Sequence, residues 1–399
     1  MNKQQEPRLR FNGFTDAWEE KVLGEVTEYL SDGTHFSPKS QNGEYKYITS
    51  KNIRNSGLDL SDVSYISAEE HQEIYKRCSV KFGDLLLTKD GASTGNCCIN
   101  FLDEEFSLLS SVAVLRPKQK KHNANFLCQV LQSPIGQNEI KGSMAGQAIT
   151  RITLEKLRAY KFNFPLYEEQ THLGLFFRRL DSLIAESRAV LEKSRQLKKA
   201  MLAKMFPANG EKIPKIRFKG FEGEWESRKL GDVVEIVMGQ SPSSTSYTDN
   251  PSDFILVQGN ADMKNGKVCP RVWTTECIKL GAAGDIVMSV RAPVGDVGKT
   301  DYDIVVGRGV CAIKGNEFIY QTLWKMKLDG YWNSLSSGST FESINSNDVK
   351  NSEILIPIQE EQTAIGNFFR QLDETIALQS AEIEKLNQLK KGLLAAMLV

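Results

Sequence analysis

Two long stretches of the chain carry apolar side chains at alternating spacings of three and four residues, the pattern of an amphipathic helix. They cover 168–205 and 360–397, and each follows a proline and begins with Glu-Glu, which suits the positive end of a helix dipole. A helix over the first stretch is expected to be ~57 Å long at about 1.5 Å per residue. The apolar positions are Phe177, Leu180, Ile184, Leu191, Met201 and Met205 in the first stretch, and Phe369, Leu372, Ile376, Ile383, Leu386, Leu393 and Met397 in the second.

The two predicted helices are copies of one another. EEQTHLGLFFRRLD at 168–181 and EEQTAIGNFFRQLD at 360–373 share ten of fourteen positions, at an offset of 192 residues. A single amphipathic helix ordinarily packs on its own domain, but two matched apolar stripes favour packing on each other as a coiled coil. The eight residues predicted to form this packing seam are Phe177, Leu180, Ile184, Leu191, Phe369, Leu372, Ile376 and Ile383.

The segments before these helices are also related in pairs. RLRFNGFTDAWEEKVLGEVTEY at 8–29 and KIRFKGFEGEWESRKLGDVVEI at 215–236, called the lead segments below, share ten of twenty-two positions, and their aromatic residues are expected to pack in the domain cores. FGDLLLTKDGASTG at 82–95 resembles AGDIVMSVRAPVG at 283–295, and GQAITRI at 146–152 lies opposite GSTFESI at 338–344. Short apolar runs such as DLLLT and ILVQGN predict strands. The middles, about 30–80 and 237–280, show no convincing similarity.

These repeats predict an α+β (mixed α/β) protein with two globular domains, joined and spaced by two long helices in an antiparallel coiled coil. A chain of 399 residues suits two domains better than one core. Antiparallel helices would place the domains at opposite ends of a rod, related by a pseudo-twofold axis. The predicted boundaries are 1–165 and 207–357 for the globular domains, and 166–206 and 358–399 for the helices.

The composition is that of an ordinary globular protein and names no partner. Lys+Arg and Asp+Glu both number 50, so no basic excess indicates a stand-alone nucleic-acid binder. The 7 cysteines are scattered without a C-x-x-C pair, which argues against a disulfide framework and a structural zinc site. We expect a cytoplasmic protein that does not enter a membrane, because neither a signal peptide nor a long apolar span is evident.

No enzyme motif is complete. Gly298-Lys299-Thr300 resembles the end of a phosphate-binding loop, but Pro293 occupies the position of the required upstream glycine. Asn250-Pro251-Ser252 is not the Asn-Pro-Pro-aromatic motif of amino-methyltransferases. Asp253 with Asp262-Met263-Lys264 fits the spacing of a metal-dependent nuclease, but this spacing is common by chance, and a solvated turn is the preferred interpretation. We therefore expect a binding protein with no catalytic residue, metal site or bound cofactor.

The ordered duplication resembles the specificity (S) subunit of type I restriction–modification enzymes over the whole chain. The resemblance rests on the helix starts Pro165-Leu-Tyr-Glu168-Glu169-Gln170 and Pro357-Ile-Gln-Glu360-Glu361-Gln362 and on the GDLLL and GDIVM elements, repeated in one order. It implies two target-recognition domains, each reading one half of a bipartite double-stranded DNA target. It also implies that the helices set the spacer and dock two methyltransferase (modification) subunits, which two ATP-driven restriction subunits (translocase/nuclease) join.

The resemblance further implies that S-adenosylmethionine, ATP and Mg are bound by the partner subunits, and that this chain is not an enzyme. Half-sites on one face of a duplex are spaced by about one helical turn, roughly 34–36 Å, which a helix of the predicted length can span. The alternative function is a coiled-coil protein–protein adaptor without sequence-specific DNA binding. A nuclease built on the acidic cluster is a third hypothesis.

Polar and basic loop residues are the candidates for DNA contact, because Arg, Lys, Asn and Gln read base edges while Ser, Thr and Lys position phosphates. Loops that occur in both halves are favoured, because pseudo-symmetry would aim both at the groove. The predicted DNA-binding residues are Lys51, Asn52, Arg54, Lys89, Ser93, Thr94, Gln147, Thr150 and Arg151 in the first half, and Gln240, Ser241, Gln258, Asn260, Lys264, Arg291, Ser339 and Thr340 in the second.

Overall fold

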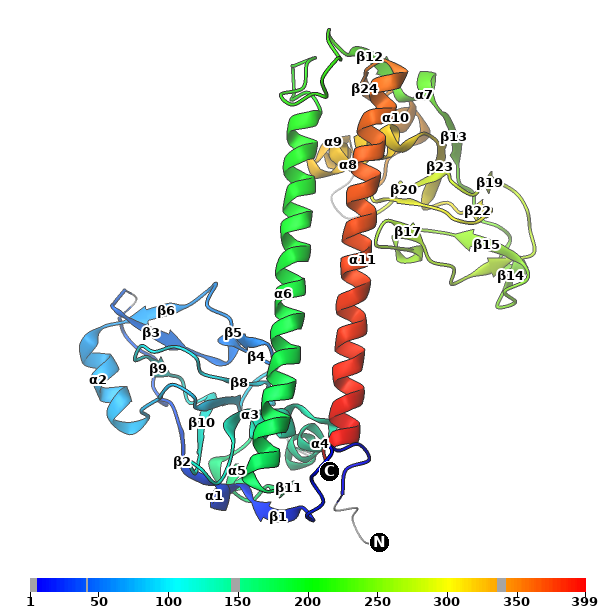
Figure 1. Cartoon of the computed structure of the whole chain (residues 1–399). Helices are drawn as coiled ribbons and strands as arrows, with labels where there is room; N and C mark the ends of the chain where they lie inside the picture. Colours follow the sequence, from blue (N-terminus) through cyan, green and yellow to red (C-terminus); the bar gives the residue numbers. More distant parts are fainter. Residues whose placement is uncertain (1–5, 41, 145–150, 336–341) are drawn as a thin grey trace. The chain divides into compact units, whose positions relative to one another are not determined.

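The computed structural model of the chain describes residues 6–40, 42–144, 151–335 and 342–399 (Figure 1). The chain forms two compact units. Unit 1 consists of Met1–Ala189 together with Ala381–Val399, and unit 2 is Val190–Ser380. Each unit therefore holds one globular body, the start of the long helix that follows this body, and the end of the other long helix.

The two long helices lie where the sequence predicts them. Helix α6 covers Tyr167–Met205 and helix α11 covers Gln359–Met397, and each has 39 residues. Each helix follows a short strand and a proline, and two glutamates in its first turn favour the positive end of the helix dipole. The repeat in the sequence thus corresponds to a repeat of one helix.

Within unit 1, the first part of α6 runs antiparallel to the last part of α11. Lys390 Nζ lies 2.6 Å from Asp181 Oδ1, and Arg188 Nη2 donates a hydrogen bond to Asn387 Oδ1 at 3.4 Å. The numbers of the paired residues rise along α6 as they fall along α11, so the two helices have opposite directions in this unit.

Unit 2 repeats the arrangement with the helices exchanged. Lys198 Nζ of α6 lies 2.6 Å from Asp373 Oδ1 of α11, and the rings of Phe206 and Phe369 are 6.0 Å apart. Asp181 and Asp373 are related by the 192-residue offset, and so are Lys198 and Lys390. One contact between antiparallel helices is therefore built twice.

The residues of the predicted packing seam differ in burial. Phe177 and Phe369 are completely buried, and each lies in the core of its own unit together with the end of the other long helix. The other buried members, at most 9% exposed, are Ile184, Leu191 and Ile383. The half-buried members are Leu180, Leu372 and Ile376.

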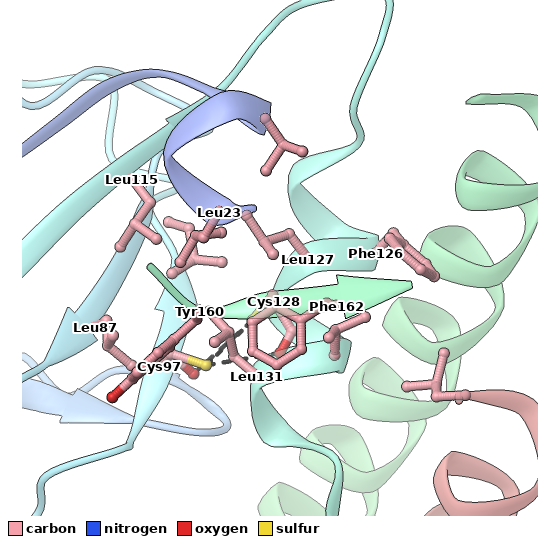
Figure 2. Packing of buried hydrophobic residues seen from close by; sticks show 14 of the residues in the cluster. Leu23, Leu87, Cys97, Leu115, Phe126, Leu127, Cys128, Leu131, Tyr160 and Phe162 are labelled. Carbon is pink, nitrogen blue, oxygen red and sulfur yellow. Dashed lines mark hydrogen bonds between the residues drawn. The ribbon is translucent and has the colours of Figure 1, made fainter. Parts of the chain in front are cut away.

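The body of unit 1 is built on an antiparallel sheet with the strand order β2-β10-β7-β8, formed by β2 (Thr27–Asp32), β10 (Val112–Pro117), β7 (Leu85–Thr88) and β8 (Cys97–Ile99). Successive side chains point to opposite faces of a strand. Leu85 and Leu87 of β7 accordingly lie in a core shared with helix α3 (Ala124–Gln132), and Leu86 lies in a second core on the other face. Figure 2 shows part of the first core, in which strand residues meet α3.

The strands of unit 1 are β1 (Glu19–Val22), β2 (Thr27–Asp32), β3 (Tyr45–Ile48), β4 (Ile53–Arg54), β5 (Gly57–Leu58), β6 (Ser64–Ile66), β7 (Leu85–Thr88), β8 (Cys97–Ile99), β9 (Ser107–Leu108), β10 (Val112–Pro117) and β11 (Lys161–Phe164). Its remaining helices are α1 (Leu23–Val26), the 3₁₀ turn η1 (Ser50–Asn52), α2 (Ala68–Arg77), α4 (Pro134–Met144) and α5 (Leu154–Arg158). Strand β1 pairs with β11, β4 forms a hairpin with β5, and a small sheet has the order β6-β3-β9.

Unit 2 contains a six-stranded sheet of order β13-β23-β20-β21-β17-β16, a five-stranded sheet of order β14-β18-β15-β22-β19, and the pair β12-β24. Its strands are β12 (Glu226–Lys229), β13 (Glu235–Met238), β14 (Tyr247–Thr248), β15 (Phe254–Val257), β16 (Met263–Lys264), β17 (Lys267–Val268), β18 (Trp273–Thr274), β19 (Leu280–Gly281), β20 (Ile286–Ser289), β21 (Val297–Lys299), β22 (Ile304–Val306), β23 (Val310–Lys314) and β24 (Glu353–Ile356). Its helices are α7 (Leu230–Val233), η2 (Ser244–Ser246), η3 (Asn260–Asp262), α8 (Glu317–Leu328), α9 (Tyr331–Leu335) and α10 (Ser346–Lys350).

The two bodies share a framework even where their sequences are unrelated. The order β2-β10-β7-β8 corresponds to β13-β23-β20-β21, and the parallel pair β3–β9 corresponds to β15–β22. The turn and hairpin η1-β4-β5 correspond to η3-β16-β17. The middles of the halves therefore carry matching elements that sequence similarity did not reveal, because burial constrains the apolar pattern of a strand and leaves its side chains free to vary.

The predicted fold class is confirmed: the chain is a mixed α/β protein with a duplicated body and two long helices that run antiparallel in each unit. No helix in the described ranges combines the length and the apolar character needed to cross a membrane.

A bidentate ion pair connects each lead segment to the start of its long helix. Arg10 Nε and Nη2 donate to the two carboxylate oxygens of Glu169, both at 2.7 Å, and Arg217 makes the same pair of 2.7 Å bonds with Glu361. The two glutamate side chains are only 2% and 0% exposed. These hydrogen bonds raise the pKa of both arginines. The ion pairs explain why the arginine of the lead segment and the second glutamate of the helix start are repeated together.

The tryptophans of the lead segments pack in the domain cores as expected, whereas the phenylalanines Phe11, Phe14, Phe218 and Phe221 are half-buried. Trp18 and Trp225 are 1% exposed, and their rings lie edge-on to Phe126 and Phe318 at centroid distances of 5.9 Å and 5.5 Å. A Cβ atom on Gly174 of α6 would come within 2.9 Å of Phe126 N, so only glycine allows this approach of α6 to α3. The glycine at the same position of the repeat, Gly366, meets α8 equally closely.

We expect Arg217→Ala to lower the free energy of unfolding of unit 2 by about 3 kcal/mol, because Glu361 would keep a buried charge without its partner. Urea denaturation followed by tryptophan emission measures this change, since four of the 5 tryptophans belong to unit 2.

Lys212→Ala is the matched control, because the Lys212–Glu224 pair of the same unit is 55% and 64% exposed. Such a pair contributes about 0–1 kcal/mol. Equal losses of stability in the two variants would contradict the structural role of the Arg217–Glu361 pair.

Candidate nucleic-acid interface

Three loops of unit 1 that carry predicted DNA-binding residues meet at one end of its main sheet. Ser93 Oγ, in the loop after β7, donates to Ser50 O of η1 at 3.3 Å. Arg151 Nε lies 3.7 Å from Asp90 Oδ2 of the same loop, and the two residues form a β-bridge. The turn and hairpin η1-β4-β5, the loop after β7 and the segment at Arg151 therefore form one continuous surface.

The cations of this surface are exposed and only weakly held. Lys51 Nζ lies 2.8 Å from Asp62 Oδ2, and Arg54 Nε lies 3.6 Å from Asp59 Oδ2. All four of these side chains are between 38% and 83% exposed. Exposed ion pairs contribute about 0–1 kcal/mol, so a phosphate or a base edge can replace these carboxylates at small cost.

Two predicted contact residues lie beneath this surface. Asn52 is 2% exposed, and its amide bonds to Thr49 N, Asp59 O and Asp62 O at 3.0 Å each. Lys89 is also 2% exposed, and its Nζ lies 3.1 Å from Asp32 Oδ2. A polar loop residue that points inward cannot be told from one that points outward by sequence alone. Both side chains hold the loops in shape, and the interface proposed below leaves them out.

The hydroxyl residues of the loop after β7 are half-buried. Thr94 Oγ1 donates to Gly91 O at 2.6 Å, which closes the turn of this loop. Four further predicted contacts, Gln147, Thr150, Ser339 and Thr340, lie outside the described residues.

The predicted residues of unit 2 also come from adjoining loops. Gln240 N donates to Val306 O at 3.0 Å, and Gly307 N donates to Val257 O at 2.7 Å. Gln240 and Gln258, which follows Val257, therefore flank the end of strand β22. Gln258 Nε2 donates to Tyr247 OH at 2.7 Å. Ser241 is exposed next to Gln240, and Asn260 is half-buried at the start of η3.

Arg291 belongs to the β-bridge of unit 2 that corresponds to the Asp90–Arg151 bridge of unit 1. It forms a β-bridge with Ser343, and its side chain is exposed. Each body thus presents one exposed arginine at this bridge: it is the first of the two bridged residues in unit 2 and the second in unit 1.

The hairpins show a second correspondence between cations. Arg54 ends β4 opposite Gly57, and Lys264 ends β16 opposite Lys267. Both Arg54 and Lys264 are exposed, and each stands immediately before the hairpin turn. The signal in the sequence is a cation followed by an asparagine that opens the turn, Arg-Asn-Ser-Gly in one half and Lys-Asn-Gly in the other.

Arg308 is an exposed residue that the sequence analysis missed. It lies between Gly307 and Gly309 in the turn from β22 to β23. A Cβ atom on Gly309 would come within 2.0 Å of Gln258 O, and Val290 N donates to Gly309 O at 2.9 Å. The turn is thus enclosed by two loops of the candidate surface, and the Gly-Arg-Gly triplet is the signal that could have indicated it.

Asp262, one of the two acidic residues considered for a nuclease, serves the loop itself. Asp262 is 2% exposed, so the expected solvated turn is wrong at this position. Its Oδ2 accepts from Gln258 N and Gly259 N at 2.7 and 3.2 Å, and its Oδ1 accepts from Arg271 Nε at 2.9 Å. Within the described part of the chain, no group of three or more His, Cys, Asp or Glu side chains could hold a metal ion. The arrangement suits binding by exposed cations and amides.

The sequence model of the type I restriction modification DNA specificity domain family matches the chain twice, over 15–193 and 222–388. The chain belongs to this family. The duplicated match coincides with the duplicated framework, since each match includes one body and most of the long helix that follows it.

Two specificity subunits of Methanocaldococcus jannaschii are similar to this family member over nearly their whole length. The putative type I restriction enzyme MjaX specificity subunit is 27% identical, and the MjaVIII specificity subunit is 21% identical. Each similarity covers 96% of this chain and 92% of the relative.

Solved structures of type I systems have the same fold. The S subunit of a type I restriction–modification system from M. genitalium is 16% identical, with 99% of both chains covered and a TM-score of 0.69. A chain from a study of complex assembly and conformational transition in the type I R-M system is 21% identical, with 96% of this chain and 97% of that chain covered and a TM-score of 0.56. These similarities extend over both bodies and both long helices of the chain.

Proposed function

We propose that the chain is the DNA sequence-specificity subunit of a type I restriction–modification complex, in which each body reads one half of a bipartite double-stranded target. The target-recognition domains in this proposal are 1–165 and 207–357. The observation that carries it is the matched position of loops with different side chains, above all the bridges Asp90–Arg151 and Arg291–Ser343. Because the two bodies share one framework, their corresponding loops point in the same way, and the different side chains on these loops then read different base pairs.

The helical segments 166–206 and 358–399 are proposed to set the spacer and to dock two methyltransferase subunits, with two restriction subunits completing the complex. The antiparallel contacts of α6 and α11 within each unit support a fixed helix register. Exposed leucines on both helices, such as Leu175 and Leu378, suit contacts with a partner protein.

In this proposal the partner subunits supply the chemistry. S-adenosylmethionine, ATP and Mg are assigned to the methyltransferase and restriction subunits, and the complex to the cytoplasm. The specificity subunit contributes exposed donors and acceptors that orient the target, and it takes no part in bond making or breaking.

The proposed contacts are the accessible members of the predicted set together with Arg308. Cations at the bridges and hairpins are assigned to base edges or phosphates, and hydroxyl residues are assigned to phosphates. The residues are Lys51, Arg54, Ser93, Thr94 and Arg151 in the first domain, and Gln240, Ser241, Gln258, Asn260, Lys264, Arg291 and Arg308 in the second.

Mapping of methylated bases across a genome, with the chain present and with its gene deleted, tests the function. We expect one bipartite motif to lose methylation upon deletion. Methylation that is independent of the chain, combined with equal binding of random duplexes by the chain and its methyltransferase partner in a gel shift, would favour the coiled-coil adaptor.

Arg291→Ala is expected to relax recognition of one half of the motif, because an arginine that contacts a base contributes about 1–3 kcal/mol of discrimination. The same methylation map measures this as new motifs that differ in one half only. An unchanged map would sink the assignment of Arg291 to a base.

Arg54→Ala and Lys264→Ala are expected to weaken DNA binding by the assembled methyltransferase complex if these cations contact phosphates. Each lost contact should make the slope of log affinity against log salt concentration shallower by about 1. Lys229→Ala is the matched control, because Lys229 lies on β12 and hydrogen-bonds to Asn351 Oδ1 at 3.2 Å, away from the hairpin. A slope that is the same in all three variants would remove both hairpin cations from the interface.

A further inference from the structure

Gln132, the last residue of α3, connects a long helix to the hairpin of the candidate DNA surface. Its Nε2 donates to Asn55 O at 3.0 Å and to Cys97 O at 2.9 Å. Its Oε1 accepts from Lys390 Nζ of α11 at 2.9 Å. Asn55 stands in the turn between β4 and β5, directly after Arg54. One half-buried amide thus spans from α11 to the tip that carries an exposed cation.

The helix side of this connection is itself fixed. Lys390 Nζ is 2.6 Å from Asp181 Oδ1, and Gln129 Nε2 donates to Asp181 Oδ2 at 2.9 Å. The Lys390 side chain is 13% exposed, so it has little freedom to leave. Because Gln129 and Gln132 are both on α3, this helix contacts the Asp181–Lys390 pair at two points.

The hairpin side is fixed by the same strand that Gln132 contacts. Cys97 N donates to Asn55 Oδ1 at 3.0 Å, while Cys97 O accepts from Gln132. Asn96 Nδ2 also donates to Ile53 O, at 3.3 Å. The hairpin is therefore held at Ile53 and at Asn55 by the start of β8, and Gln132 supplies the bond to Asn55 O.

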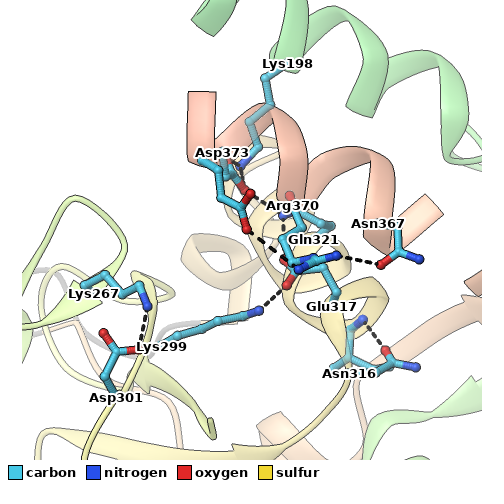
Figure 3. A network of polar contacts seen from close by, with 12 residues as sticks. Lys198, Lys267, Lys299, Asp301, Asn316, Glu317, Gln321, Asn367, Arg370 and Asp373 are labelled. Atoms are coloured by element: carbon cyan, nitrogen blue, oxygen red, sulfur yellow. Dashed lines mark hydrogen bonds and ion pairs between the residues drawn. The ribbon is translucent and has the colours of Figure 1, made fainter. Parts of the chain in front are cut away.

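Unit 2 builds this joint differently, and Figure 3 shows its polar network. Gln321 Nε2 donates to Asp373 Oδ2 at 2.8 Å, as Gln129 does to Asp181. At the position of Gln132 in the 192-residue repeat, however, stands Trp324, and Lys198 Nζ lies 4.9 Å from the centre of its ring. A cation–π contact thus replaces the polar bridge, and a tryptophan in this place offers no carbonyl-binding amide.

We propose that Gln132 is a positioning residue for recognition by the first target-recognition domain. It holds the β4–β5 turn, and with it Arg54, in register with the helix pair that determines where this domain stands on the duplex. The inference rests on the proposed function, and it goes further by naming a residue that acts without touching DNA. The amide is needed because it donates twice and accepts once, which no other side chain of similar size can do.

Two substitutions distinguish the hydrogen bonds that Gln132 makes to the hairpin side from the one that it makes to Lys390. Gln132→Glu keeps an acceptor for Lys390 but removes both donors, so it releases Asn55 O and Cys97 O. Gln132→Met keeps the length of the side chain and removes the bonds to Asn55 O, Cys97 O and Lys390. Gln196→Met is the matched control, because Gln196 of α6 is exposed and bonds only to Glu192 Oε1 at 3.1 Å among the described contacts.

The assay is methylation by the assembled complex on duplexes with single changes in either half of the motif. The half read by the first domain is identified as the one that keeps its discrimination in Arg291→Ala. We expect Gln132→Glu and Gln132→Met each to reduce discrimination in this half by about three- to tenfold, since a typical hydrogen bond contributes about that factor. Discrimination in the other half and the spacer length should stay as in the unaltered chain.

Hydrogen exchange gives a second readout. We expect faster exchange in 53–58 in both variants. Unchanged discrimination in the first half, or an equal loss in both halves, would overturn the role of Gln132, the latter because it indicates general loss of structure. If the unaltered complex methylates without a motif, the proposed function itself fails, and this result is distinct from a failure of the Gln132 inference.

Discussion

In each unit, one aspartate of a long helix binds both the other long helix and the body, and the rest of the architecture depends on this contact. Asp181 binds Lys390 of the opposite helix and Gln129 of its own body, and Asp373 binds Lys198 and Gln321 in the same way. A carboxylate has enough acceptor sites for both partners. Because helix–helix and helix–body contacts share one residue, neither can shift by a turn without breaking the other. The fixed register follows from this shared residue.

The ion pairs are poorly suited to add stability and well suited to select one arrangement. Lys198 is 7% exposed, and burial lowers its pKa although Asp373 opposes this effect. Removing a lysine from water costs several kcal/mol, which a single partner repays only in part. An apolar pair would pack in several registers, whereas an unpaired Lys198 would be left buried in any register but one. We therefore attribute to these pairs a selection of register, in the same sense as a buried polar residue in a coiled-coil seam.

Much of the framework could be predicted from the sequence, because repetition and apolar spacing report directly on buried contacts. The extents of both long helices, the strand at Leu85–Thr88 and the burial of Trp18 and Trp225 followed from these patterns. The orientation of individual loop side chains could not be predicted, since Asn52 and Lys89 have the same chemistry whether they point inward or outward. The common framework of the middle segments was also hidden, because β-strands of two to four residues tolerate almost any apolar side chain.

The location of the repeated residues shows how one chain can keep its geometry while the proposed DNA-binding surface changes. The identical positions (the arginine of each lead segment, the second glutamate, the glycine and the aspartate of each long helix) all lie where body meets helix, away from the hairpins and bridges. Substitutions at Arg54, Lys264, Arg291 or Arg308 therefore alter an exposed side chain without disturbing a frame contact.

Gln132 is the exception in unit 1, because it belongs to both the frame and the hairpin. In unit 2 the same position is Trp324, whose contact with Lys198 stays within the frame. At this position unit 1 joins its β4–β5 hairpin to α11 by hydrogen bonds, whereas unit 2 has a cation–π contact within the frame, so unit 1 should be less tolerant of change at this joint.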